Sequence, residues 1–67
     1  MDYAYIQKFL NKKVNLNAAV SQGKSMFYTG RILKVNSDYL IILDKYNVEV
    51  AISLDSIKQI CEAQNGF

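Results

Sequence analysis

The chain has one cysteine, no histidine and no proline among its 67 residues. Because Cys61 has no second cysteine to pair with, a disulfide within the chain is excluded, and this cysteine usage is typical of a reducing, cytoplasmic compartment. The lack of histidine and the scattered carboxylates disfavour a metal site, and we expect no cofactor. No apolar run approaches the roughly 20 residues of a membrane-spanning helix. Residues 1–11 contain an acid and lack the long apolar centre of a secretory signal, so a soluble cytoplasmic protein is predicted.

Catalytic groupings are also lacking. The sequence contains no paired acid and base, no activated nucleophile and no ligand set, so we expect a protein that is not an enzyme and has no catalytic residues. Cys61 has no cationic or basic motif beside it, and we interpret it as a small buried apolar residue.

Charge is unevenly distributed, although the net charge is only +2. Residues 1–37 carry six basic and one acidic side chain, whereas residues 38–67 carry two basic and five acidic ones. Such asymmetry fits an acid-binding face, complementary charge between neighbouring subunits, or an ordinary solvated surface.

The hydrophobic period changes from helical to alternating near residue 13. A helix is predicted over about residues 2–11, with Asp2 as its N-cap and with Ile6, Phe9 and Leu10 on one face. A helix this short cannot hold alone, so its apolar face must dock on the rest of the chain. Residues 13–20 then alternate as in a half-buried strand, and a glycine-centred turn at 21–25 predicts a hairpin.

Further strands follow that turn. The second strand, residues 26–35, changes its apolar face between Gly30 and Leu33, which predicts a bulge or a strong bend. After a turn at 36–38, the apolar run 39–43 indicates a strand buried on both faces. A fourth strand at 48–53, one helical turn at 53–56 and a fifth strand at 57–61 precede a tail, residues 62–67, predicted to be frayed.

Two stretches resemble the motifs of the Sm-like family, to which Hfq belongs. The first holds Gly30, Ile32, Val35 and Asn36, followed by Tyr39 and the apolar strand; the second is residues 50–60, with apolar positions at Ile52, Ile57 and Ile60. The resemblance implies a mainly β single domain over residues 1–67. It would comprise an N-terminal helix at about 2–11, a five-stranded, strongly bent antiparallel Sm-like barrel at about 13–61 and the tail.

The sequence also departs from those motifs. Asn36 replaces the usual acid, and Leu40 stands where eukaryotic and archaeal members place a base-contacting asparagine. The Arg-Gly of Sm proteins or the Lys-His of Hfq would fall within residues 53–55, and neither is present.

The resemblance implies single-stranded RNA as a ligand. Tyr39 would stack on a base, and Asn36 would read a base edge. Other residues placed at this site are Asp38, Ser53 and Asp55, with phosphate contacts from Lys12, Lys13, Lys24, Arg31 and Lys34. The alternatives stay open: Tyr39 as an ordinary first strand residue, Asn36 as a turn residue that bonds its own backbone, and the basic residues as solvated side chains.

Self-association is expected for two reasons. A small domain without disulfides or metal often gains stability by oligomerising, and Sm-like barrels are open between their fourth and fifth strands. A closed homo-oligomeric ring would pair these edges, using Val48, Val50, Ile52, Ile57, Ile60 and Cys61. Tyr3, Tyr5, Tyr28 and Tyr46 are further interface candidates. The function is therefore predicted to be a non-enzymatic RNA-binding ring, or alternatively a self-assembling interaction or scaffolding module without a nucleic-acid ligand.

Overall fold

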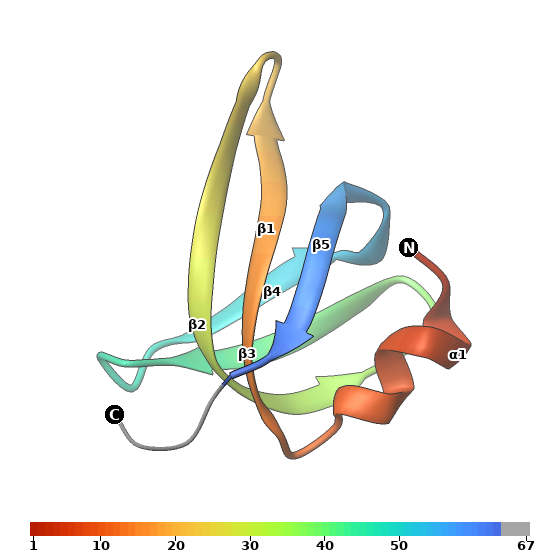
Figure 1. Ribbon diagram of the computed structural model, residues 1–67, viewed down its shortest axis with the longest axis vertical. Helices are drawn as coiled ribbons and strands as arrows, with labels where there is room; N and C mark the ends of the chain where they lie inside the picture. Colours follow the sequence, from red (N-terminus) through yellow and green to blue (C-terminus); the bar gives the residue numbers. More distant parts are fainter. Residues whose placement is uncertain (64–67) are drawn as a thin grey trace.

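A short N-terminal helix precedes five antiparallel strands that form one sheet (Figure 1). The computed structural model describes residues 1–63 of the chain, so the end of the predicted tail lies outside the described residues. The elements are α1 (Tyr3–Ile6), the 3-10 turn η1 (Gln7–Phe9), β1 (Lys13–Ser21), β2 (Lys24–Val35), β3 (Tyr39–Asp44), β4 (Glu49–Ser53), the 3-10 turn η2 (Leu54–Ser56) and β5 (Ile57–Glu62).

The strand order is β4-β3-β2-β1-β5, and β4 does not pair with β5 in the described residues. The mainly β fold with five antiparallel strands is therefore confirmed, as an unclosed sheet. Strand β2 belongs to both halves of it. Residues 24–31 of β2 pair with β1, and residues 30–35 pair with β3. In Figure 1 β1 and β5 cross over β3 and β4, so the bent sheet faces itself.

The bend in β2 has two local causes, both of which the sequence predicts. Gly30 lies against the backbone of Leu43 and Asp44, where a β-carbon would clash. Between Ile32 and Lys34 the register with β3 shifts, which identifies Leu33 as the bulged residue. A bulge bends its strand and increases the twist, so β2 can serve both halves of the sheet.

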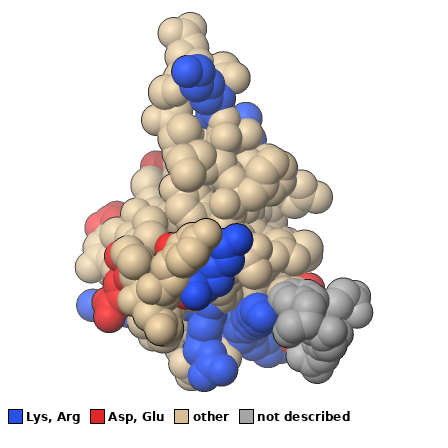
Figure 2. All heavy atoms as spheres, turned by 90° about the vertical axis from the view of Figure 1, so that its left-hand side faces the viewer, with Lys and Arg blue, Asp and Glu red and all other residues tan. Residues whose placement is uncertain are grey.

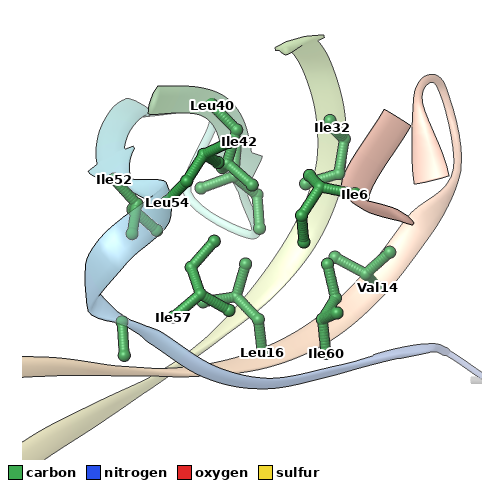
Figure 3. Close-up of a cluster of buried hydrophobic side chains, with 11 residues drawn as sticks. Ile6, Val14, Leu16, Ile32, Leu40, Ile42, Ile52, Leu54, Ile57 and Ile60 are labelled. Atoms are coloured by element: carbon green, nitrogen blue, oxygen red, sulfur yellow. The ribbon is translucent and has the colours of Figure 1, made fainter. Parts of the chain in front are cut away.

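The core fills the space between the two halves of the sheet. Figure 3 shows side chains of β3, β4 and η2 pointing toward those of β1 and β5, with Ile6 of α1 among them. Ile6 is completely buried, so the predicted docking of the helix through this residue is confirmed. The buried apolar cluster consists of Ile6, Val14, Leu16, Ala18, Ile32, Leu40, Ile42, Ile52, Leu54, Ile57 and Ile60.

The helix ends earlier than the pattern predicts. Asp2 caps it, since a carboxylate oxygen of Asp2 accepts a hydrogen bond from the Tyr5 N–H at 3.3 Å. At Leu10 the backbone becomes extended, and Asn11 takes a left-handed conformation with φ 66°. Leu10 is therefore exposed and forms a bridge to Ile32 instead of sharing the buried face of Ile6. The prediction for Leu10 is wrong because the chain leaves the helix one turn early.

Four further predictions require correction. Strand β3 is fully buried on one face only: Leu40 and Ile42 are inaccessible, whereas Ile41 and Leu43 are half-buried. Cys61 is exposed and not a buried residue, because its neighbour Ile60 faces the core and Cys61 pairs with the exposed Asn15.

The predicted tail also begins too early. Glu62 belongs to β5, and the N–H of Ala63, a buried residue, donates to the Lys13 carbonyl at 2.8 Å. Strand β4 begins at Glu49, one residue later than predicted, so Val48 lies in the preceding turn. Among residues 1–63, no helix has the length and apolar character that crossing a membrane would require.

Candidate nucleic-acid interface

The turn between β2 and β3 is organised by Asn36. Its side-chain oxygen Oδ1 accepts hydrogen bonds from the N–H groups of Asp38 and Tyr39, both at 2.9 Å. Asparagine commonly stabilises turns in this way. The carbonyl of the Asn36 side chain is thus engaged, and the Nδ2 amide group is the part that can donate to a base edge.

The same turn lies beside η2. Tyr39 and Ser53 are direct partners in the β3–β4 ladder, and the Leu54 N–H donates to the Asp38 carbonyl at 3.0 Å. Asp55 follows in η2 and is exposed. The structure therefore brings the predicted Asn36, Asp38, Tyr39 and Ser53 to one end of the sheet.

Three of the predicted basic residues share the outer face of the sheet, and we call Lys13, Arg31 and Lys34 the basic face. Lys13 and Arg31 are direct partners in the β1–β2 ladder. Each points outward, because the adjacent Val14 and Ile32 are buried. Beyond the bulge Lys34 is opposite Ile41, the outward residue of β3.

Tyr39 belongs to this outer face as well. It lies two residues before Ile41 on β3, and residues two apart on a strand share a face. Diagonal neighbours across antiparallel strands lie about 7–8 Å apart, within reach of long side chains. Tyr39 and Lys34 are such neighbours, so the predicted stacking residue and a predicted phosphate contact are adjacent.

Lys12 and Lys24 lie apart from the basic face. Lys24 pairs with Ser21 at the tip of the β1–β2 hairpin, where Figure 2 shows basic atoms well separated from those lower on the same side. Lys12 Nζ lies 3.7 Å from a carboxylate oxygen of Glu62. The structure thus divides the five predicted phosphate contacts into one cluster of three and two residues outside it.

Sequence reasoning missed a groove between β2 and the β3–β4 turn. It has a volume of about 620 Å³, and Phe27 and Tyr46 line it with exposed fractions of 76% and 74%. The lining also includes Arg31 and Lys45. One signal was present in the sequence: β2 was predicted to be about twice as long as β3, so half of β2 had to lack a neighbour on that side.

The predicted interface residues divide between core and surface. Ile52, Ile57 and Ile60 belong to the chain's own core, whereas Val48 and Cys61 are exposed and Val50 is half-buried. The candidate aromatic residues Tyr3, Tyr5 and Tyr46 are exposed, and Tyr28 is half-buried. A contact through β4 and β5 would thus rely on their backbone edges more than on their isoleucines.

Comparison with known proteins adds no relative: no protein-family model, curated protein or solved structure matches this chain significantly. Any functional assignment therefore rests on the geometry of its own residues.

Proposed function

We propose that this protein is a non-enzymatic, Sm-like RNA-binding protein that holds single-stranded RNA on the basic face. The observation that supports this most directly is the ladder pair Lys13–Arg31, with Lys34 and Tyr39 on the same outer face. Basic side chains that share one face suit the phosphates of a nucleic-acid backbone, and the adjacent aromatic ring offers a stacking surface for a base.

The residues of the proposed RNA site have different chemical roles. Arg31, Lys34 and Lys13 neutralise phosphates, which supplies affinity that does not depend on sequence. Tyr39 stacks on one base, and stacking of this kind contributes about 1–3 kcal/mol per base. The Nδ2 group of Asn36, two residues beyond Lys34, donates to a base edge. RNA bound in this way is held and not chemically changed.

The same proposal includes a homo-oligomeric ring in the cytoplasm. Strands β4 and β5 are the two ends of the sheet, five and six residues long, and each has one edge without a neighbour in the described residues. Pairing β4 of one subunit with β5 of the next is a head-to-tail contact that closes by rotation. A ring would repeat the basic face once per subunit and increase avidity for a long RNA.

Fluorescence anisotropy with labelled ten-nucleotide oligo-U and oligo-A at 50 and 200 mM salt tests the RNA proposal. The double variant Arg31→Ala/Lys34→Ala should weaken binding at least tenfold and reduce the salt dependence, because phosphate contacts release counterions. Lys24→Ala/Lys58→Ala is the control: Lys24 lies at the hairpin tip, and Lys58 lies on β5 beside Asn17 and Ala18 of β1, several residues from Lys13. This pair removes the same charge away from the basic face and should change affinity less than threefold. Equal weakening by both pairs would show that only net charge matters and would overturn the proposal.

A second pair of variants tests the stacking role. Tyr39→Ala should lower affinity by about 1–3 kcal/mol, whereas Tyr39→Phe retains the ring and should bind normally. Light scattering on each variant checks that assembly is unchanged.

An interaction or scaffolding module is the second candidate, and the unpaired strand edges favour it. In that case light scattering would show a stable oligomer, while neither oligonucleotide would bind at low salt.

A further inference from the structure

One half of β2 has a neighbour on one side only. Strand β1 pairs with β2 throughout residues 24–31, but β3 pairs only with residues 30–35, because the chain turns away after Asp44. Along residues 24–29 the side of β2 opposite to β1 therefore has no strand beside it in the described chain. Figure 1 shows this part of the β1–β2 hairpin extending beyond β3 and β4.

The direction of the backbone groups follows from Ile32. Its N–H donates to the Lys12 carbonyl at 3.0 Å, and its carbonyl accepts from the Asn11 N–H at 2.8 Å, so both groups face the β1 side. Successive residues of a strand direct these groups to opposite sides. The β1–β2 register is regular from Arg31 back to Ser25, so the odd-numbered Phe27 and Thr29 direct their N–H and C=O groups to the open side.

The groove described above runs beside this open edge. Phe27 and Tyr46, the two most exposed large apolar side chains of the described residues, form part of its walls, and Met26 and Tyr28 also line it. Proteins usually protect an exposed strand edge with charge, proline or a covering segment. An open edge combined with exposed aromatic rings is instead typical of a surface that takes another strand.

Charge indicates what kind of strand fits. Arg31 and Lys45 line the groove at one end of the open edge, and Lys24 lies at the other. Asp44 is the acidic residue in the groove lining. Its Oδ1 atom already accepts hydrogen bonds from the N–H groups of Tyr46 and Val48, at 2.8 and 3.1 Å. A second copy of β2 would bring the same cations together, whereas a segment with acidic ends would complement them.

We infer that the open edge of β2, residues 24–29, binds an extended segment of a partner protein by β-strand addition, and that this segment has an apolar centre and acidic ends. Main-chain hydrogen bonds from Phe27 and Thr29 give the affinity, and the groove gives the specificity. Six residues of strand span roughly 17 Å, which defines the length of the segment. This inference does not rest on the proposed RNA binding: Arg31 belongs to both sites, but the main-chain contacts of the inferred site are those of Phe27 and Thr29, and neither Tyr39 nor Lys34 takes part.

The direct test is amide hydrogen exchange by NMR with a defined probe, the peptide acetyl-Asp-Glu-Val-Tyr-Val-Thr-Glu-Asp-amide. At saturation the amides of Phe27 and Thr29 should exchange at least tenfold more slowly. The amides of Met26 and Tyr28, which face β1, should change little. A peptide with lysine in place of each acid should bind at least tenfold more weakly, and one N-methylated at alternate amides should not protect either amide.

A proline substitution at an edge position of β2 tests the contribution of the backbone N–H group to peptide binding separately from that of the side chains. Thr29→Pro removes one outward N–H and leaves the ladder to β1 complete, since proline is tolerated where the N–H faces outward. It should weaken the peptide at least tenfold. Thr29→Val is the matched control: like the proline variant it loses the hydroxyl that donates to Asn15 Oδ1, but it retains the N–H and should bind normally. Ser25→Pro is a second edge variant should Thr29→Pro unfold.

The inference would be overturned if the acidic peptide did not slow the exchange of the Phe27 and Thr29 amides, or if it slowed exchange in β4 or β5 instead. Equal binding of the lysine peptide would also overturn it. So would slower exchange on raising the protein concentration alone, which would assign the edge to a second copy of the chain. Binding of oligo-U is measured on the same proteins. Thr29→Pro should change it less than twofold, so the failure of one proposal is distinguishable from the failure of the other.

Discussion

Gly30 packs directly on the backbone of Leu43, so closely that a β-carbon at position 30 would lie 2.8 Å from the Leu43 carbonyl carbon. This contact lies where β2 passes from its partner β1 to its partner β3. The bend of the sheet, and with it the enclosure of the core, depends on the absence of a side chain at this position.

Gly30→Ala should therefore lower the free energy of unfolding by about 3 kcal/mol or more, because the clashing atoms belong to backbone that cannot move freely. Gly23→Ala is the control. Gly23 has φ +74° and open space around it, so the cost there should be limited to about 1–2 kcal/mol of backbone strain. Urea titration followed by circular dichroism measures both, and a smaller loss at Gly30 than at Gly23 would contradict the assigned role.

Asn36→Ala removes the acceptor for two backbone N–H groups, and we expect a loss of about 1–2 kcal/mol in the free energy of unfolding. Asn36→Asp retains an oxygen at the same position and should lose less than about 0.5 kcal/mol at neutral pH. Thermal unfolding distinguishes the two variants. An equal loss in both would show that the Nδ2 amide group, and not Oδ1, stabilises the turn.

Two asparagines on the outer face of β1 should respond oppositely to replacement. Asn17 has a buried Oδ1 atom without a hydrogen-bond partner in the described residues, whereas Asn15 Oδ1 accepts from the Thr29 hydroxyl at 2.7 Å. Asn17→Val should stabilise the fold by about 1 kcal/mol, since an unsatisfied buried acceptor is costly and valine favours strands.

Asn15→Val removes a satisfied hydrogen bond and should lower the stability by about 0.5–1 kcal/mol. Chemical denaturation of both variants measures the difference. If Asn17→Val destabilises the protein more than Asn15→Val, a partner for the Asn17 oxygen must exist in solution.

Ile6→Ala should lower the free energy of unfolding by about 2–5 kcal/mol, because Ile6 is completely buried between the helix and the sheet. Tyr5→Ala is the control on the same helix. Tyr5 is exposed and makes an edge-to-face contact with Phe9, with ring centroids 5.6 Å apart, so its loss should cost about 1 kcal/mol. Comparable losses would mean that the helix is held by its exposed face.

The sequence by itself determined the local features of the fold. The alternation of Val14 and Leu16 with polar residues predicted β1, and Asp2 predicted the start of the helix. Gly30 predicted the bend of β2. Strand period and helix caps could be read because they depend on neighbouring residues, and a glycine inside a strand is itself a sign of a bend or a close backbone approach.

Part of the candidate site was also predictable. Arg31 and Lys34 could be named because charge is visible in a sequence, whereas Asn36 and Tyr39 were named from the resemblance to the Sm-like motifs. Their arrangement in space could not be predicted, since it depends on which residues of separate strands lie opposite one another.

The register between strands decided which of the remaining residues face outward. The shift at Leu33 places Lys34 opposite Ile41, and the alignment of β5 on β1 exposes Cys61 while it buries Ile60. A shift of one residue moves every side chain of a strand to the other face, and β1 and β5 are far apart in the chain, so no turn between them sets their register. The sequence indicated the open edge of β2 only as a difference in predicted strand length. Its position along residues 24–29 depends on where β3 turns away, at Asp44, in the assembled sheet.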